Sequence, residues 1–139
     1  MKTFFYKITI FLVLGPLILG VTEGWGVDWE YYGTNEEGSY FYDAESMKHL
    51  SQNIVRVFVQ SVYSEKGVSH WVEGGGKEFD NLDFTLIWSE FNCADRSIRH
   101  LQIVFYSKNG KVFYPINNKG WHFFIPDSMS ETLYNVVCK

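Results

Sequence analysis

The sequence lacks the short motifs that identify common classes of enzyme. It has no Gly-x-Ser-x-Gly elbow and no Cys-x-x-Cys pair, and Gly74-Gly75-Gly76 lacks the Lys and Ser or Thr that complete a phosphate-binding loop. The four histidines, His49, His70, His100 and His122, have none of the spacings typical of zinc ligands. We therefore predict a protein without catalytic residues, metal site or cofactor.

Long apolar runs are also scarce, since the one such run lies near the N-terminus at Ile8–Leu19. This run is too short for a transmembrane helix, which needs ~20 apolar residues. It follows the basic residues Lys2 and Lys7 and precedes small residues around Gly24, an order typical of a secretory signal peptide. We expect export of the chain, with no transmembrane span left after cleavage.

Cleavage after Gly24 would divide the chain into a signal peptide over residues 1–24 and one mature domain over residues 25–139. Cleavage after Gly26 fits the same rule, and an uncleaved membrane anchor is the alternative. No cysteine follows the apolar run, so we do not expect a lipid anchor. The mature protein is then expected in the periplasm or outside the cell, at the cell surface.

The chain also has fewer basic than acidic residues. The 12 basic and 16 acidic residues of the chain become 10 and 15 once Lys2, Lys7 and Glu23 leave with the signal peptide, a formal charge of −5. Proteins that bind nucleic acid need a basic surface, so this balance argues against such a partner. Aromatic residues, at 19% of the chain, are abundant, and they suit both strands and protein interfaces.

Only two cysteines are present, Cys93 and Cys138. In an oxidising compartment they can form one intramolecular disulfide, whose loop of 45 residues corresponds to a stabilisation of ~4 kcal/mol. We expect this pairing. An intermolecular disulfide and a nucleophilic thiol assisted by a histidine are the alternatives.

The apolar pattern of the mature chain predicts several short strands. Trp29–Thr34 and Ser39–Asp43 are expected to form a hairpin, and Asp43–Leu50 a helical turn capped by Asp43. Asn53–Tyr63 is the clearest strand. Its alternation places four side chains on one face, namely Val55, Val57, Val59 and Ser61.

The segment Ser64–Asn81 contains three successive glycines and is predicted to be a mobile surface loop. Four acidic side chains flank these glycines, namely Glu73, Glu78, Asp80 and Asp83. Their oxygen atoms are of the type that binds calcium, but their spacing does not match a calcium-binding loop. We therefore interpret the segment as a solvated acidic loop.

Two further strands follow at Leu82–Cys93 and Ser97–Ser107. Strict alternation along the first strand would place Leu82 and Phe84 on the same face of the sheet. Along the second strand it would place His100 and Leu101 on opposite faces. In all, one face of the first strand would carry Leu82, Phe84, Leu86 and Trp88, and one face of the second Leu101, Ile103 and Phe105.

A hairpin and a helix complete the predicted fold. Asn109-Gly110 suits a type I′ turn before a returning strand at Lys111–Tyr114. Ser128 and Glu131 form a capping box, and an apolar stripe made of Met129, Leu133, Val136 and Val137 has helical spacing. The predicted class is α+β, an antiparallel sheet of about six strands with a C-terminal helix packed on one face.

Several stretches of the mature chain follow one another in an order that can be recognised. They include Trp29-Glu30-Tyr31-Tyr32, Tyr40-Phe41-Tyr42-Asp43, Ile54-Val55-Arg56-Val57-Phe58-Val59, Asn92-Cys93, Ile125-Pro126-Asp127-Ser128 and Val137-Cys138. Taken in order from Trp29 to Cys138, they resemble the surface-adhesin protein E family of bacterial exported proteins. The resemblance implies a six-stranded antiparallel sheet, a C-terminal helix and a bridge between the two cysteines.

The same resemblance implies a function and partners. It implies adhesion to host matrix proteins such as vitronectin and laminin, and the ability to form a homodimer. We accordingly expect an exported, non-enzymatic protein-binding module with an extracellular matrix or envelope protein as its partner. A small exported hydrolase with an unrecognised site, which would need a pocket with at least two ionisable groups of strongly shifted pKa, is one alternative. A structural subunit of an envelope assembly is the other.

Overall fold

The computed structural model describes residues 27–114 and 120–139, so the predicted signal peptide over residues 1–24 lies outside the described residues. The strands are β1 (Trp29–Asn35), β2 (Gly38–Asp43), β3 (Lys48–His49), β4 (Ile54–Tyr63), β5 (Leu82–Asn92), β6 (Ser97–Ser107), β7 (Val112–Phe113) and β8 (His122–Phe123). The helical elements are α2 (Glu65–Gly75), the 3-10 turn η1 (Lys77–Phe79) and α3 (Met129–Val137).

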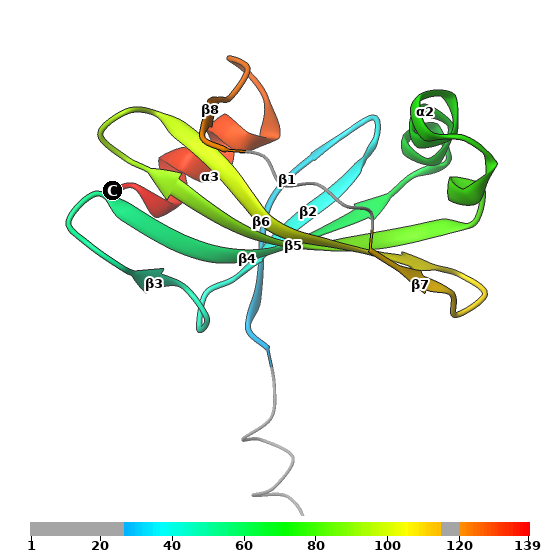
Figure 1. The fold of residues 1–139 in the computed structure, drawn as a ribbon, viewed down its shortest axis with the longest axis horizontal. Helices are drawn as coiled ribbons and strands as arrows, with labels where there is room; N and C mark the ends of the chain where they lie inside the picture. Colours follow the sequence, from blue (N-terminus) through cyan, green and yellow to red (C-terminus); the bar gives the residue numbers. More distant parts are fainter. Residues whose placement is uncertain (1–26, 115–119) are drawn as a thin grey trace, which may run out of the picture.

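All of these strands belong to one antiparallel sheet (Figure 1). Six of them lie in the order β1-β2-β4-β5-β6-β7, while the two-residue strands β3 and β8 pair with β4 and β6. Helices α2 and α3 both lie on the same side of the sheet, near opposite ends (Figure 1). The predicted sheet of about six strands with a C-terminal helix on one face is therefore confirmed.

The first part of the core forms where α3 packs on the sheet. Val55, Val57 and Val59 of β4 are buried there, as predicted from their alternation. From α3, Leu133 and Val137 pack against them. The predicted capping box begins this helix, because Ser128 Oγ accepts a hydrogen bond from the Glu131 backbone N–H at 3.3 Å.

The second part of the core lies at the other end of the same face. Phe79 of η1, Leu82 of β5 and Phe105 of β6 are buried together, and Trp71 of α2 packs against them. The ring of Trp71 meets that of Phe105 at 5.0 Å between centroids. Both helices thus bury their apolar side chains on one face of the sheet, which leaves its other face without a covering element in the described structure.

Two irregularities in the strands overturn part of the predicted alternation. The pairing of β5 with β6 shifts at Asp83, so Leu82 joins the helix-covered face and Phe84 lies on the open face. It shifts again at Leu101, which is 42% exposed, and His100 lies directly opposite the buried Ser89. Such bulges reverse the side-chain pattern beyond them, and single-residue alternation cannot reveal them.

The prediction of a mobile loop over Ser64–Asn81 is wrong. Helix α2 and the turn η1 fill this segment, and Ser64 caps α2 by accepting a hydrogen bond from the Gly67 backbone N–H at 3.2 Å. The glycines lie at the end of the helix, where Gly76 adopts a φ of 98°. With a ψ of −178°, this backbone conformation is one that glycine adopts far more readily than other residues, so Gly76 allows the chain to leave the helix here.

Two smaller predictions also need correction. Asp43–Leu50 is a turn followed by β3, although Asp43 does accept hydrogen bonds from backbone N–H groups, one of them that of Glu45 at 3.2 Å. The hairpin after β6 exists, but only Gly110 has a positive φ and the Ser107 backbone N–H donates to the Lys111 carbonyl. This is a three-residue loop ending in a glycine bulge rather than a type I′ turn.

The predicted disulfide joins the last helix to a central strand. Cys93 follows β5 and Cys138 follows α3, and the two are bonded with their Cα atoms 5.5 Å apart. The Tyr134 hydroxyl adds a hydrogen bond of 2.8 Å to the Cys93 carbonyl. The bridge leaves neither sulfur as a free thiol, so the alternative of a nucleophilic cysteine is not supported.

We expect loss of this disulfide to lower stability strongly. The double variant Cys93→Ser/Cys138→Ser should lose ~4 kcal/mol, because the unfolded chain regains the entropy of a 45-residue loop. For a domain of this size the melting temperature should fall by about 10 °C or more, as measured by circular dichroism. An unchanged melting temperature would show that the covalent bond does not hold α3 in place.

Candidate functional site

One candidate site is a groove beside α2. The helix is held close to the turn between β1 and β2, since Ser64 Oγ donates to the Glu36 carbonyl at 2.6 Å and Lys66 pairs with the Glu36 carboxylate. Gly67 is buried at this contact, where a Cβ atom would lie 2.0 Å from the Glu37 carbonyl oxygen. Only glycine permits this approach of the helix to the turn.

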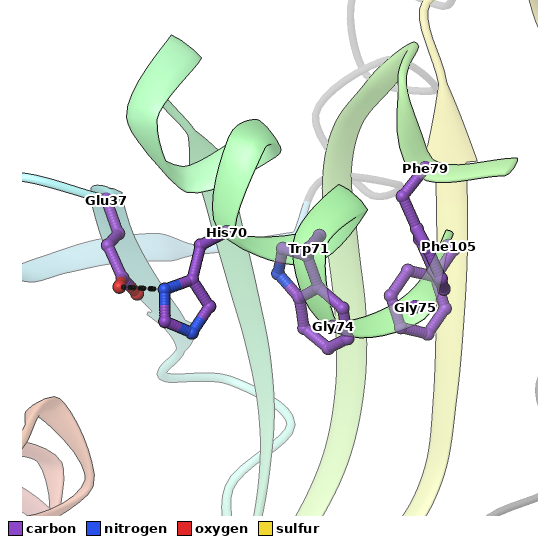
Figure 2. Close-up of a pocket in the computed structure, with 7 residues that line it drawn as sticks. All are labelled: Glu37, His70, Trp71, Gly74, Gly75, Phe79 and Phe105. Carbon is purple, nitrogen blue, oxygen red and sulfur yellow. Dashed lines mark ion pairs between the residues drawn. The ribbon is translucent and has the colours of Figure 1, made fainter. Parts of the chain in front are cut away.

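The groove has an apolar floor and a polar rim (Figure 2). Its volume is about 480 Å³, and its walls include Trp71, Phe79 and Phe105. At the rim, Glu37 Oε1 lies 3.3 Å from His70 Nδ1, and these side chains are 41% and 73% exposed. A groove of this kind can hold an apolar or aromatic side chain while its rim binds a polar group.

A smaller cavity lies between α3 and the sheet and contains polar groups. Because of the bulge at Leu101, His100 Nδ1 reaches Ser89 Oγ at 2.9 Å, and the ring of His122 is 5.8 Å away. Burial, and to a lesser degree the neighbouring His122, lower the pKa of His100 to about 4. Burial also raises the pKa of Tyr32, which lines the same cavity.

This cavity meets only part of what the hydrolase alternative requires. His100 and Tyr32 are two ionisable groups with shifted pKa values in one cavity. The cavity volume, however, is about 140 Å³, whereas binding sites for small molecules usually measure about 300–1,000 Å³. Ser89 is 1% exposed, so a substrate would have no approach to its hydroxyl. The arrangement favours a polar interior over a catalytic site.

A third group of polar side chains lies on the open face of the sheet. The Glu90 side chain is 0% exposed and accepts hydrogen bonds from Arg56 Nη2 at 2.8 Å and Arg99 Nε at 2.7 Å. Burial raises the pKa of Glu90, but the hydrogen bonds and charges of Arg99 and Arg56 outweigh burial and lower it overall. The carboxylate is therefore ionised and fully used within the fold.

Most of the side chains that the sequence suggested as possible ligands or catalytic groups lie apart from one another in the structure. Of the acidic set, Glu73 and Asp80 line one shallow hollow, whereas Glu78 lies on η1 and Asp83 on β5. Among the residues described, no three His, Cys, Asp or Glu side chains converge to hold a metal. Within the same ranges no helix is long and apolar enough to cross a membrane.

The groove and the approach of His100 to His122 were not predicted from the sequence. The groove depends on α2, which the spacing of Val68, Trp71 and Val72 would have indicated. The histidine pair depends on β8 and on the bulge at Leu101, and neither leaves a signal in a single sequence.

Comparisons with known proteins agree on one family and one fold. A family model described as surface-adhesin protein E matches residues 29–139. Solved structures of Haemophilus influenzae protein E, including a selenomethionine form and a second crystal form, are 17% identical to this chain, with TM-scores of 0.52, 0.54 and 0.53. The alignments cover 80% of this chain and 83%, 85% and 87% of those chains. No curated protein matches the sequence.

We expect His100 to make the protein sensitive to mild acid. The unfolded state binds a proton near pH 6.5, whereas folded His100 binds one only near pH 4. Stability should therefore fall by about 2–3 kcal/mol as the pH is lowered from about 6.5 to about 4. His100→Asn, which keeps a polar group near Ser89, should reduce this fall in urea unfolding experiments. Parallel pH curves for the two proteins would contradict the assignment.

Proposed function

We propose that this chain, which belongs to the surface-adhesin protein E family, is an exported protein that binds other proteins and catalyses no reaction. The family match carries the general role, and the groove beside α2 is the observation that supports a specific contact. A partner would place an apolar or aromatic side chain in the groove, against the ring of Trp71. Such anchors often contribute most of the binding energy of an interface.

The export of the protein is part of this proposal. Residues 1–24 have the layout of a signal peptide, which would leave a mature domain over residues 25–139 without a lipid anchor. Surface display would make matrix proteins such as vitronectin and laminin accessible partners. A homodimer and a place in an envelope assembly are compatible with the same role, since the edge strand β1 and the open face of the sheet carry no neighbour in the described structure.

The shape of the groove also supports a binding role over the hydrolase alternative. The Glu37–His70 pair at its rim is well exposed to solvent, so neither side chain lies in the water-excluded environment typical of catalytic groups. Gly74 and Gly75 leave the apolar floor open instead of placing a nucleophile there. The groove thus offers shape and apolar surface to a ligand.

A substitution that fills the groove tests this proposal. A Cβ atom added at Gly74 meets nothing within 4 Å, so Gly74→Leu should fold normally while its side chain occupies the groove. Leucine also has a higher helix propensity than glycine, so the melting temperature should not fall. Binding to immobilised vitronectin and laminin, measured by surface plasmon resonance, should weaken about tenfold or more.

Ser69→Leu is the matched control, because it adds the same side chain on α2 at an exposed position outside the groove. It should bind like the unmodified protein. Equal binding by all three proteins would exclude the groove as the contact. Absence of binding to either matrix protein, together with crosslinking only to envelope proteins, would favour the envelope assembly instead.

A further inference from the structure

The open face of the sheet carries a row of basic side chains. Lys48 of β3 lies opposite Arg56 of β4, which lies opposite Glu90 of β5, which in turn lies opposite Arg99 of β6. Directly paired residues of neighbouring strands point to the same side of a sheet. The row therefore crosses four strands and contains three cations and one carboxylate, in a chain whose formal charge is −4.

The row holds more positive charge than the fold requires. Glu90 is completely buried and both of its carboxylate oxygens are occupied, Oε2 by Arg56 and Oε1 by Arg99. One guanidinium would neutralise this carboxylate, so the second guanidinium and Lys48 are in excess. The Arg56 and Arg99 side chains remain 33% and 39% exposed, and each can donate further hydrogen bonds to an anion in solvent.

The arginine side chains are also held in place before any ligand arrives. Arg56 donates to Glu90 from both Nε, at 3.0 Å, and Nη2, at 2.8 Å. The guanidinium of Arg99 lies between Glu90 and the ring of Trp121, whose centroid is 4.6 Å away. Side chains that are already ordered lose little conformational entropy on binding.

Aromatic rings lie on the same face beside the row. Trp88 and Phe58 are cross-strand partners two residues along from Glu90 and Arg56, and their rings meet at 4.8 Å. Trp29 stacks on Phe58 at 5.8 Å. Trp121 is 39% exposed next to Arg99. A ligand on this face would meet fixed cations and the faces of aromatic rings together.

We propose that this open face binds an acidic polysaccharide whose sugar rings carry carboxylate groups. The same two arginines already bind the carboxylate of Glu90, and arginine suits carboxylates because its donors match their geometry. A sugar ring also has a C–H face that can pack on Trp121 or Trp88, because the faces of aromatic rings carry negative potential. This site is separate from the groove beside α2 and does not depend on the proposed protein partner.

A rigid sugar chain fits this surface better than an acidic peptide does. In a uronic acid the carboxylate is attached directly to a ring with an apolar face, so one rigid unit satisfies a cation and a neighbouring aromatic ring. The carboxylate of Asp or Glu lies on a flexible stem, which would lose rotamer freedom on binding. We therefore expect polygalacturonate to bind more tightly than polyglutamate of equal charge.

Isothermal titration calorimetry with both polymers tests this inference on the exported chain. Polygalacturonate should bind, and raising the salt concentration from about 50 to about 300 mM should weaken binding about tenfold, since salt screens exposed charges. Lys48→Gln should weaken binding about threefold to fivefold, and Trp121→Ala about fivefold. Both residues are exposed and lie outside the core, so folding should be retained.

Lys108→Gln is the matched control, because Lys108 is an exposed lysine in the hairpin after β6, away from the row. It should bind as the unmodified protein does. Equal weakening by Lys48→Gln and Lys108→Gln would overturn the site, because it would indicate a diffuse charge effect. Equal affinity for polyglutamate would overturn the choice of ligand, as would a lack of binding to polygalacturonate. The Gly74→Leu variant should bind the polymer normally, so this test remains distinct from that of the groove.

Discussion

The packing of α3 on one face of the sheet is the interaction on which the rest of the structure depends. Leu133 and Val137 cover Val55 and Val57, and the disulfide to Cys93 holds the helix end there. With α2 on the same side, the two buried apolar clusters of the described residues both lie on this face. Within residues 27–114 and 120–139 no helix covers the other face of the sheet, so that face must be stable in contact with solvent or with a partner.

The open face can remain in contact with solvent because it carries charged side chains and partly exposed aromatic rings. Glu90 lies at the centre of the sheet without access to water, which would be costly for an unpaired carboxylate. Arg56 and Arg99 satisfy both of its oxygens while keeping part of their own surface exposed. The buried carboxylate of Glu90 thus holds two arginine side chains in place on a surface that needs no covering helix. The same ion pairs that stabilise the fold also form the proposed binding surface.

A helix or strand could be predicted from the sequence where the residues that determine it are close together in the chain. β4 could be predicted because Val55, Val57 and Val59 alternate without interruption, and α3 because Ser128 and Glu131 mark its start. The side-chain directions of β5 and β6 could not, because the bulges at Asp83 and Leu101 arise from pairing between strands. Helix α2 was not predicted because its glycines suggested a loop. One of these glycines, Gly67, is nevertheless required for the helix to pack on the β1–β2 turn. The candidate site depends on these nonlocal features, so it was less predictable than the fold.

The proposed role requires that the uncovered surfaces of this exported fold be accessible outside the cell. Protease treatment of intact cells, with released peptides identified by mass spectrometry, tests it most directly. If the protein is displayed at the cell surface, peptides from residues 25–139 should be released before the outer membrane is opened, with Trp25 as the N-terminus of the mature chain. Complete protection of the protein until the outer membrane is permeabilised would contradict display at the cell surface, and with it the proposed contact with extracellular ligands.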